Sequence, residues 1–424
     1  MDNLQKLDHE LIWHPFTSFA DSPEPVFIES ADGIYLYAKD GKKIIDAVSS
    51  WWVNLHGHSN PHIAQAIARQ AQKLEHVIFA GFTHEPAISL AKNLKQILPS
   101  NQAKIFFSDN GSTAVEVALK MAFQFWYNQG LEKRKVIALK GAYHGDTFGA
   151  MSIGDRGIFS DPFSRYLFDV EFVDFPDNSN DTRTIEQFKA LVTTGEVAAF
   201  IFEPLVQGAS GMRMYSASVL NELLSEAKKN NVVCIADEVF TGFGRTGKMF
   251  ACDYIHELPD IMAISKGITG GSMALGVTSC SQKIVSAFTS ADFTKTFFHG
   301  HSYTANPIAC AAANASFELL MKPECGEQIK MITRAHYAFM GNLQGHRSVK
   351  EVRCMGTILA IELKAVDETS YSNEMRKRIY PFFLERNILT RPLGNIIYVL
   401  PPYIIQDSEL KVIYDCIEEF MATL

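Results

Sequence analysis

The sequence predicts an α/β fold: a large domain with a mostly parallel sheet between helices, joined to a smaller α+β domain. Short apolar runs alternate with helical stretches through the middle of the chain, which is typical of strands buried on both faces. After about residue 318 this alternation gives way to long helices and a few strands. The length of 424 residues also exceeds what one ordinary core accommodates.

The first elements precede the alternating region. Gly33–Gly41 has the pattern of a strand that ends in an Asp-Gly turn, and Lys43–Ala47 that of its hairpin partner. Asn60–Leu98 has a helical pattern. Pro61 falls in the first turn, where proline is tolerated, and Pro99 follows the last periodic residues.

The alternating region contains five apolar runs with the pattern of strands and a helix between the first two of them. The runs are Lys104–Ser108, Val136–Leu139, Val197–Phe202, Val232–Ala236 and Ile261–Ile264, and the helix is Thr113–Tyr127. Ligands of open α/β sheets bind beyond the carboxyl ends of the strands. The polar groups that follow these runs are therefore expected to face one crevice: Asp109 to Ser112, Glu203, Asp237 with Glu238, and Lys266.

The two ends of the chain supply the remaining strands. Ile388–Arg391 and Ile396–Pro402 follow the long C-terminal helices, and together with the N-terminal strands they are expected to make a smaller α+β domain. The sequence thus predicts a large domain over residues 57–318 and a small domain made of residues 1–56 and 319–424.

Composition excludes several classes of protein. The net charge of -8 and the absence of a basic run argue against nucleic acid or anionic lipid as a partner. No apolar run approaches the roughly 18 residues of a membrane span, and the polar N-terminus lacks a signal segment. The 7 cysteines form no CxxC pair, which disfavours disulfides and a cysteine metal site. These features predict a cytoplasmic protein.

Asp237 and Lys266 are the first candidates for chemistry, because each follows an apolar run directly. A buried carboxylate needs a partner, and a protonated pyridine nitrogen is one. A helix cap or a structural ion pair would explain Asp237 equally well. A lysine in such a place can be a nucleophile toward an aldehyde. A surface or phosphate-binding lysine is the alternative for Lys266.

Two further segments fit the same crevice. Gly111 and Ser112 lie between a strand and a helix, where free N–H groups and the helix dipole suit a phosphate, although serine is also a common helix cap. Tyr143 is placed to stack on a planar cofactor or to fill the core. His144 and Asp146 resemble metal ligands, but no third ligand has suitable spacing. The combination indicates pyridoxal 5'-phosphate (PLP) and no metal.

The chain resembles the class III (ω-type) aminotransferases of fold type I, over nearly its whole length. The resemblance is carried by Trp13–Ser18, Ser49–Trp52, Asp109–Ala118, Tyr143–Ser152, Glu203–Tyr215, Asp237–Gly247, Ser265–Gly267 and Arg391–Gly394. It implies a seven-stranded sheet in the large domain, PLP as the cofactor, and a homodimer with shared active sites. The Trp-Trp pair and Gly211–Tyr215 are most similar to members that aminate 8-amino-7-oxononanoate, a biotin precursor.

The resemblance also implies roles for individual residues. Lys266 would hold PLP as a Schiff base and move the proton, Asp237 would pair with the ring nitrogen, and Tyr143 would stack on the ring. Gly111 and Ser112 would bind the phosphate, which Ser302 would reach from the second subunit. A last group would line or support the substrate pocket: Phe16, Trp51, Trp52, Asp146, Arg245 and Arg391, the last of which would bind a substrate carboxylate.

Alternatives to this activity remain at the level of sequence. Phe16 stands where several relatives that use adenosylmethionine have tyrosine, so the amino donor is either adenosylmethionine or lysine. His301–Tyr303 also differs from the Pro-Thr form of close relatives, although serine can replace threonine as a phosphate contact. A general ω-aminotransferase and a PLP aminomutase are alternative activities. A non-catalytic protein that keeps the fold is disfavoured by Lys266 and Asp237.

Overall fold

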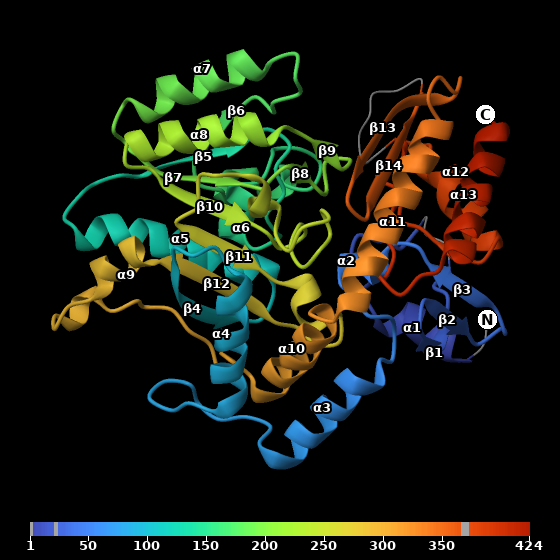
Figure 1. Cartoon of the computed structure of the whole chain (residues 1–424), viewed down its shortest axis with the longest axis horizontal. Helices are drawn as coiled ribbons and strands as arrows, with labels where there is room; N and C mark the ends of the chain where they lie inside the picture. The colour runs from blue at the N-terminus through green and yellow to red at the C-terminus, as the bar shows by residue number, and fades with distance from the viewer. Residues whose placement is uncertain (1–2, 21–23, 366–372) are drawn as a thin grey trace.

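A seven-stranded sheet forms the centre of the chain in the computed structural model, which describes residues 3–20, 24–365 and 373–424 (Figure 1). The strand order is β4-β12-β11-β10-β7-β5-β6. The strands are β4 (Gln102–Ser108), β5 (Lys135–Leu139), β6 (Glu171–Val173), β7 (Val197–Phe202), β10 (Val233–Asp237), β11 (Ile261–Ile264) and β12 (Gly276–Ser281). Only β12 runs against its neighbours β11 and β4, so the expected mostly parallel sheet is confirmed. Strands β6 and β12 were not predicted from sequence.

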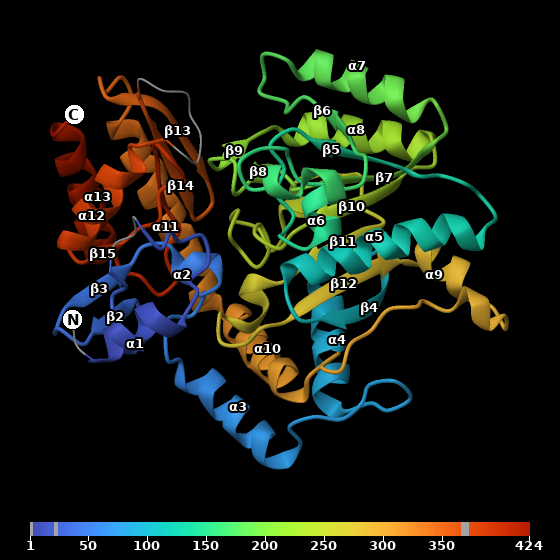
Figure 2. The same ribbon diagram turned by 180° about the vertical axis from the view of Figure 1, so that it is seen from behind.

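Helices cover both faces of this sheet because its strands are apolar on both sides. Val233 and Ile235 of β10 pack in one cluster with α5 (Gly111–Asn128) and α9 (Gln282–Phe288). Cys234 and Ala236, which alternate with them, pack in the other cluster with α7 (Asp181–Val192) and α8 (Ala217–Lys229). Figures 1 and 2 show α5 and α7 on opposite sides of the strands.

The segment Asn60–Leu98 forms two helices, where the sequence analysis expected one continuous helical stretch. They are α3 (Pro61–Lys73) and α4 (Glu85–Ile97), and both contact α10 (Pro307–Leu320). Pro86 explains why α4 begins as a separate helix, since proline cannot donate the hydrogen bond that a continuing helix requires. Gly81, with a φ of +85°, also breaks the helical pattern between them.

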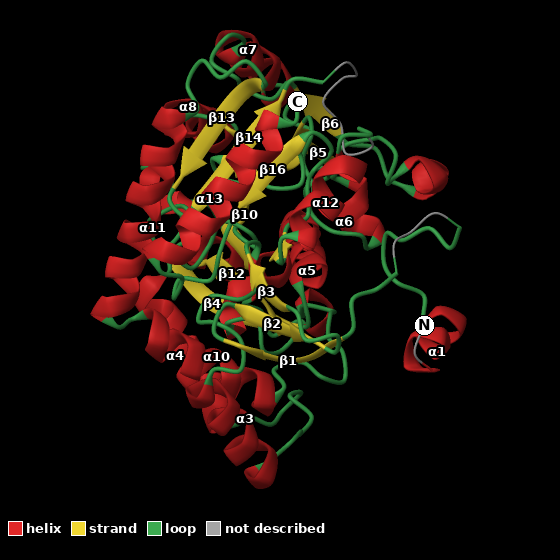
Figure 3. Ribbon diagram, turned by 90° about the vertical axis from the view of Figure 1, so that its right-hand side faces the viewer, coloured by secondary structure: helices red, strands yellow, loops and turns green. Residues whose placement is uncertain are grey.

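The two ends of the chain form two smaller sheets, and they meet in the first of these (Figure 3). One has the order β1-β2-β3-β15, with β1 (Ile28–Asp32), β2 (Tyr35–Ala38), β3 (Lys43–Asp46) and β15 (Ile388–Leu389). The other is β13-β14-β16, with β13 (Val349–Met355), β14 (Ile358–Leu363) and β16 (Ile396–Val399). The expected hairpin is present as β2 and β3, and the parallel pair of β3 with β15 unites the two ends.

The remaining elements surround these sheets. The helices are α1 (Asn3–Leu11), α2 (Ser49–Trp52), α6 (Phe148–Ser152), α11 (Pro323–Asn342), α12 (Arg376–Glu385) and α13 (Asp407–Ala422). The short strands are β8 (Val206–Gln207) and β9 (Arg213–Met214), and 3-10 turns occur at Asp161–Tyr166, Ala251–Tyr254, Lys266–Thr269 and Phe293–Lys295. The domain boundaries remain predictions, and residues 1–2, 21–23 and 366–372 of the predicted small domain lie outside the described residues. Within the described chain, no helix is long and apolar enough to cross a bilayer.

Candidate active site

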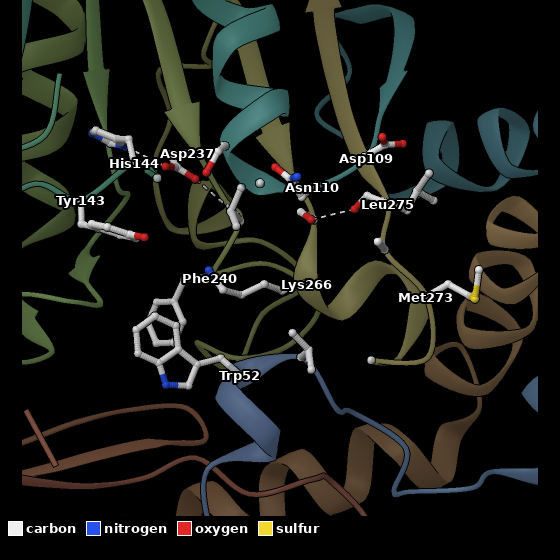
Figure 4. A pocket seen from close by; sticks show the side chains of 18 of the residues that line it. Trp52, Asp109, Asn110, Tyr143, His144, Asp237, Phe240, Lys266, Met273 and Leu275 are labelled. Carbon is white, nitrogen blue, oxygen red and sulfur yellow. Dashed lines mark hydrogen bonds and ion pairs between the residues drawn. The ribbon is translucent and has the colours of Figure 1, made fainter. Parts of the chain in front are cut away.

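The carboxyl ends of the parallel strands border a cavity of about 450 Å³ (Figure 4). Five of the predicted cofactor-binding residues line it: Gly111, Ser112, Tyr143, Asp237 and Lys266. They come from the ends of β4, β5, β10 and β11, as the rule for open α/β sheets requires. The structure therefore brings together residues that are far apart in the sequence.

The N-terminus of α5 forms one end of the cavity. The backbone N–H groups of Gly111 and Ser112 have no hydrogen-bond partner among the described residues. Asn110 is the helix cap, because its side chain accepts a hydrogen bond from the N–H of Thr113. From sequence, Ser112 was the candidate for that role. Instead, Ser112 Oγ accepts from the N–H of Asp146 at 3.2 Å. Two free donors at the positive end of a helix suit a phosphate.

Glycine at positions 111 and 145 keeps this end of the cavity open. A Cβ on Gly111 would lie 2.7 Å from Cγ1 of Val239. Gly145 has a φ of +124°, and a Cβ there would collide with Ser112. Both positions exclude larger residues for steric reasons, so the backbone can approach a ligand closely.

Asp237 ends β10 and is buried, with its carboxylate directed at the cavity (Figure 4). Oδ2 lies 2.6 Å from Nδ1 of His144, and Oδ1 accepts from the N–H of Val239 at 3.1 Å. A carboxylate has about four acceptor positions, so this one retains capacity for a protonated ring nitrogen. His144 was not predicted from sequence as the partner of Asp237. Its position could have indicated this role, because His144 is next to Tyr143 and follows a strand that borders the same crevice.

Lys266 lies half-buried at the end of β11, between the sheet and Trp52 (Figure 4). Burial lowers its pKa, while the charges of Asp237 and Glu203 act in the opposite direction. Its Nζ lies 5.1 Å from the centroid of a ring of Trp52. The φ of Lys266 is +44°, a strained value for a residue with a side chain. A half-buried amine with a lowered pKa is a nucleophile for an aldehyde.

Tyr143 and Glu203 form the side of the cavity next to β7. One oxygen of Glu203 accepts from the N–H of Tyr143 at 3.1 Å, and the other accepts from the N–H of Gly208 at 2.9 Å. Burial raises the pKa of the Tyr143 hydroxyl, and the nearby charge of Asp146 acts in the same direction. Glu203 was expected only as a residue at a strand end. The structure makes it the link between the Tyr143 loop and the hairpin of β8 and β9.

Glu203 predicts a pH dependence of stability. Burial raises its pKa from 4.5 to about 7, so the folded chain binds more protons than the unfolded chain between these values. The protonated Glu203 stabilises the folded chain fully below pH 4.5, which is its pKa in the unfolded chain. This stabilisation is lost as the pH rises through 7. We expect the free energy of unfolding of the native sequence, relative to that of Glu203→Gln, to fall by on the order of 3 kcal/mol from pH 5 to pH 8.

Urea titrations of the cofactor-free proteins at both pH values measure this difference. Glu132→Gln, at an exposed position, serves as the control and should show no such change. A constant difference between the native sequence and Glu203→Gln across this range would contradict the prediction.

A second, larger cavity of about 1170 Å³ adjoins the first, since Lys266 and Tyr143 line both. Phe16, Trp51, Trp52 and Arg391 line it as well. The Arg391 guanidinium lies 4.2 Å from the centroid of a ring of Trp51, and no described residue forms a hydrogen bond or ion pair with it. Phe16 meets Trp51 edge to face at 5.8 Å. The cavity thus combines aromatic walls with a cation that has no carboxylate partner among the residues that the structure describes.

The two tryptophans differ in environment. Trp51 is 39% exposed, whereas Trp52 is buried and donates from Nε1 to the hydroxyl of Tyr398 at 3.1 Å. Both have positive φ values, of +69° and +75°. Left-handed backbone costs an L-residue roughly 1–2 kcal/mol, so other contacts must hold this turn in place.

Two predicted site residues lie outside both cavities. Arg245 was expected to line or support the pocket, but it is buried behind it. Its guanidinium donates to the carbonyls of Trp52, Asn54 and Pro401, so it supports the backbone beneath the pocket instead of reaching the substrate space. Ser302 is exposed and borders neither cavity of its own chain.

Comparisons with known proteins give concordant results. A family model described as Aminotransferase class-III matches residues 17–421. The chain is 46% identical over 421 residues to an adenosylmethionine-8-amino-7-oxononanoate aminotransferase of Synechococcus elongatus, covering 97% of this chain and 99% of that protein. The crystal structure of a protein with the same name from Methanocaldococcus jannaschii has a TM-score of 0.93 at 36% identity, covering 99% of this chain and 98% of that one. A PLP-bound amine transaminase from an uncultivated Pseudomonas species has a TM-score of 0.90 at 29% identity, covering 97% and 98%.

Proposed function

Because the chain belongs to the class III aminotransferases, we propose that it aminates 8-amino-7-oxononanoate to 7,8-diaminononanoate in biotin biosynthesis, with S-adenosyl-L-methionine as the donor. Enzymes of this class depend on PLP, and PLP is the cofactor of this chain. The observation that carries the proposal is the junction of the two cavities at Lys266. One cavity has the features of a PLP site, and the other offers aromatic walls and the cation of Arg391.

The residues of the first cavity match the parts of PLP. The free N–H groups of Gly111 and Ser112 suit its phosphate, and Asp237 suits its protonated ring nitrogen. Lys266 is placed to bind its aldehyde carbon, and Tyr143 to stack on its ring. When bound, PLP accepts the electron pair that remains after a proton leaves the amine-bearing carbon. In the proposal, Lys266 Nζ takes that proton and later returns it.

The second cavity must admit a donor and an acceptor in turn, because one site serves both halves of a transamination. Adenosylmethionine and 8-amino-7-oxononanoate each carry a carboxylate, which the guanidinium of Arg391 is suited to bind. Trp51 and Phe16 contribute the apolar wall for the carbon chain of the acceptor. Phe16 lacks the hydroxyl that a tyrosine would offer a donor, so lysine is the alternative donor.

We also infer a homodimer with shared active sites. Ser302 is exposed on its own chain, and a second subunit would bring it to the phosphate end of the cavity. A cytoplasmic location belongs to the same proposal, and the 7 free cysteines are in keeping with a reducing compartment.

The proposed reaction is tested by supplying 8-amino-7-oxononanoate with either adenosylmethionine or lysine to the PLP-loaded protein. We expect 7,8-diaminononanoate to form with adenosylmethionine. Product with lysine alone would keep the reaction but replace the donor. Absence of product with both donors would contradict the biotin-pathway assignment and leave a general ω-aminotransferase, whereas turnover of a single substrate without a donor would indicate an aminomutase.

Arg391→Met provides the matched variant for this assay. Loss of the charged hydrogen bonds to the substrate carboxylate should raise the KM for 8-amino-7-oxononanoate by about 10- to 100-fold. Arg386→Met, which removes an arginine paired with Glu419 outside both cavities, should leave the KM unchanged. An unchanged KM in Arg391→Met would remove Arg391 from the substrate site.

A further inference from the structure

The turn Ser49–Trp52 carries the two tryptophans of the substrate cavity in an unusual backbone conformation. Its residues have φ values of +51°, +44°, +69° and +75° in order. None of them is glycine, the residue that adopts such angles without steric cost. A run of left-handed residues persists only where the surrounding structure determines it, and such strain concentrates at functional sites.

Asp46 holds the start of this turn. It is the last residue of β3 and is completely buried. Its Oδ1 accepts from the N–H groups of Val48 at 3.1 Å and Ser50 at 3.0 Å. Its Oδ2 accepts from the Ser50 hydroxyl at 2.7 Å and lies 2.9 Å from Nε2 of His58. One carboxylate therefore binds both the backbone and a side chain of the turn.

Contacts with the C-terminal strands fix the same turn from the other side. Asp46 is paired with Leu389 of β15, two residues before Arg391. The hydroxyl of Ser49 donates to the carbonyl of Leu400 at 2.7 Å, and the N–H of Leu400 donates to the carbonyl of Ala47 at 2.8 Å. Asp46 thus lies where the turn Ser49–Trp52 meets two C-terminal segments, the one that leads to Arg391 and the one that contains Leu400.

The direction of the two tryptophan side chains depends on this backbone. Trp51 points toward Arg391, whose guanidinium is 4.2 Å from its ring centroid. Trp52 points to the other side, where Nζ of Lys266 is 5.1 Å from its ring centroid. A right-handed or extended turn would direct both rings elsewhere, because successive side chains of a turn diverge according to its dihedral angles.

We propose that Asp46 is a positioning residue of the substrate cavity: its carboxylate holds the left-handed turn that sets Trp51 beside Arg391 and Trp52 beside Lys266. Asp46 lines neither cavity, so it acts only through the turn. The choice of 8-amino-7-oxononanoate as the probe in the assay rests on the proposed function. The conformational part of the inference does not depend on it.

Asp46→Asn tests the inference in the full-length, PLP-loaded protein. Asparagine keeps the size of the side chain, but its amide donor faces Ser50 Oγ and His58, whose bonds to Oδ2 are then lost or weakened. We expect the KM for 8-amino-7-oxononanoate to rise about tenfold or more, with a smaller change in kcat. The visible absorbance of the bound cofactor should persist, while the near-ultraviolet circular dichroism of the tryptophans should change.

A second substitution separates positioning from a general loss of structure. In Asp46→Asn/Ser50→Gly, glycine adopts the φ of +44° without strain, so the turn needs less support from residue 46. We expect the double variant to recover most of the KM and of the near-ultraviolet signal. Asp40→Asn is the matched control, since Asp40 accepts a hydrogen bond from the N–H of Lys42 at an exposed turn of the same hairpin.

The outcomes are distinguishable. A native KM and tryptophan signal in Asp46→Asn, or no recovery in the double variant, would overturn the role of Asp46. If the native protein does not turn over 8-amino-7-oxononanoate, the proposed function fails, while the tryptophan signal and its recovery still decide the role of Asp46. If Asp46→Asn does not fold, His58→Phe removes one partner of the carboxylate and should give the same changes to a smaller degree.

Discussion

Lys266→Ala is expected to abolish the near-violet absorbance of lysine-bound PLP and to lower transamination by roughly 10⁴-fold or more. The variant loses both the nucleophile for the aldehyde and the group that moves the proton, and proton transfer alone contributes up to about 10⁴-fold. No other lysine lines the first cavity among the described residues. Another side chain in that cavity is therefore not expected to take over the role.

Absorbance spectroscopy after addition of PLP, followed by a transamination assay, measures both effects. Lys283→Ala is a suitable control, because Lys283 is partly exposed and forms its ion pair with Asp260 away from the cavity. Circular dichroism in the far ultraviolet should be the same for the two variants and the native protein. A near-violet band that persists in Lys266→Ala, while the fold is retained, would contradict Lys266 as the attachment site.

The position of Lys266 could be predicted from sequence because a general rule of sheet geometry applies to it. Lys266 and Asp237 directly follow apolar runs, and the runs form neighbouring parallel strands, β11 and β10. The carboxyl ends of such strands necessarily meet at one edge of the sheet. The same reasoning placed Gly111 and Tyr143 at the cavity, although it did not identify His144 as the partner of Asp237.

The features that escaped prediction depend on contacts between distant parts of the chain. The left-handed turn that carries Trp51 and Trp52 contains no glycine or asparagine that would announce positive φ values. It is fixed by Asp46 and by Leu400, which is far away in the sequence. Arg245 lies in a motif that resembles active-site segments, but its direction is decided by the carbonyls that accept its hydrogen bonds. The residues next to each of these positions in the sequence do not indicate the conformation of the turn or the direction of Arg245.

The strand β12 illustrates a different difficulty. Gly276–Ser281 contains serine and threonine at positions that are buried in the sheet, so its composition resembles that of a loop. The buried hydroxyls of Thr278 and Ser279 are satisfied by Ala114 and Gln102, respectively. Those acceptors come from α5 and β4, and the sequence around β12 does not identify them. A polar strand inside a sheet is therefore recognised only after its neighbours are known.

Asp237→Asn is expected to lower kcat by about 10²- to 10³-fold while PLP remains attached to Lys266. Asparagine removes the negative charge that favours a proton on the ring nitrogen, and a neutral ring stabilises the developing negative charge less well. The KM for the carboxylate substrate should change little, since Arg391 and the aromatic walls are unaffected. A lowered kcat with an unchanged KM distinguishes a loss of electrostatic stabilisation from a loss of substrate binding.

The opposite end of the same strand supplies the control for Asp237. Asp260 is also a buried carboxylate, and it accepts from the N–H of Cys234, near the start of β10, on the side away from the cavity. Asp260→Asn should reduce stability through the weakened bond to Lys283 while leaving kcat close to native. Equal losses of kcat in Asp237→Asn and Asp260→Asn would mean that both carboxylates only support the sheet. A loss confined to Asp237→Asn would instead assign the effect to the one carboxylate of the pair that lines the cavity with Lys266.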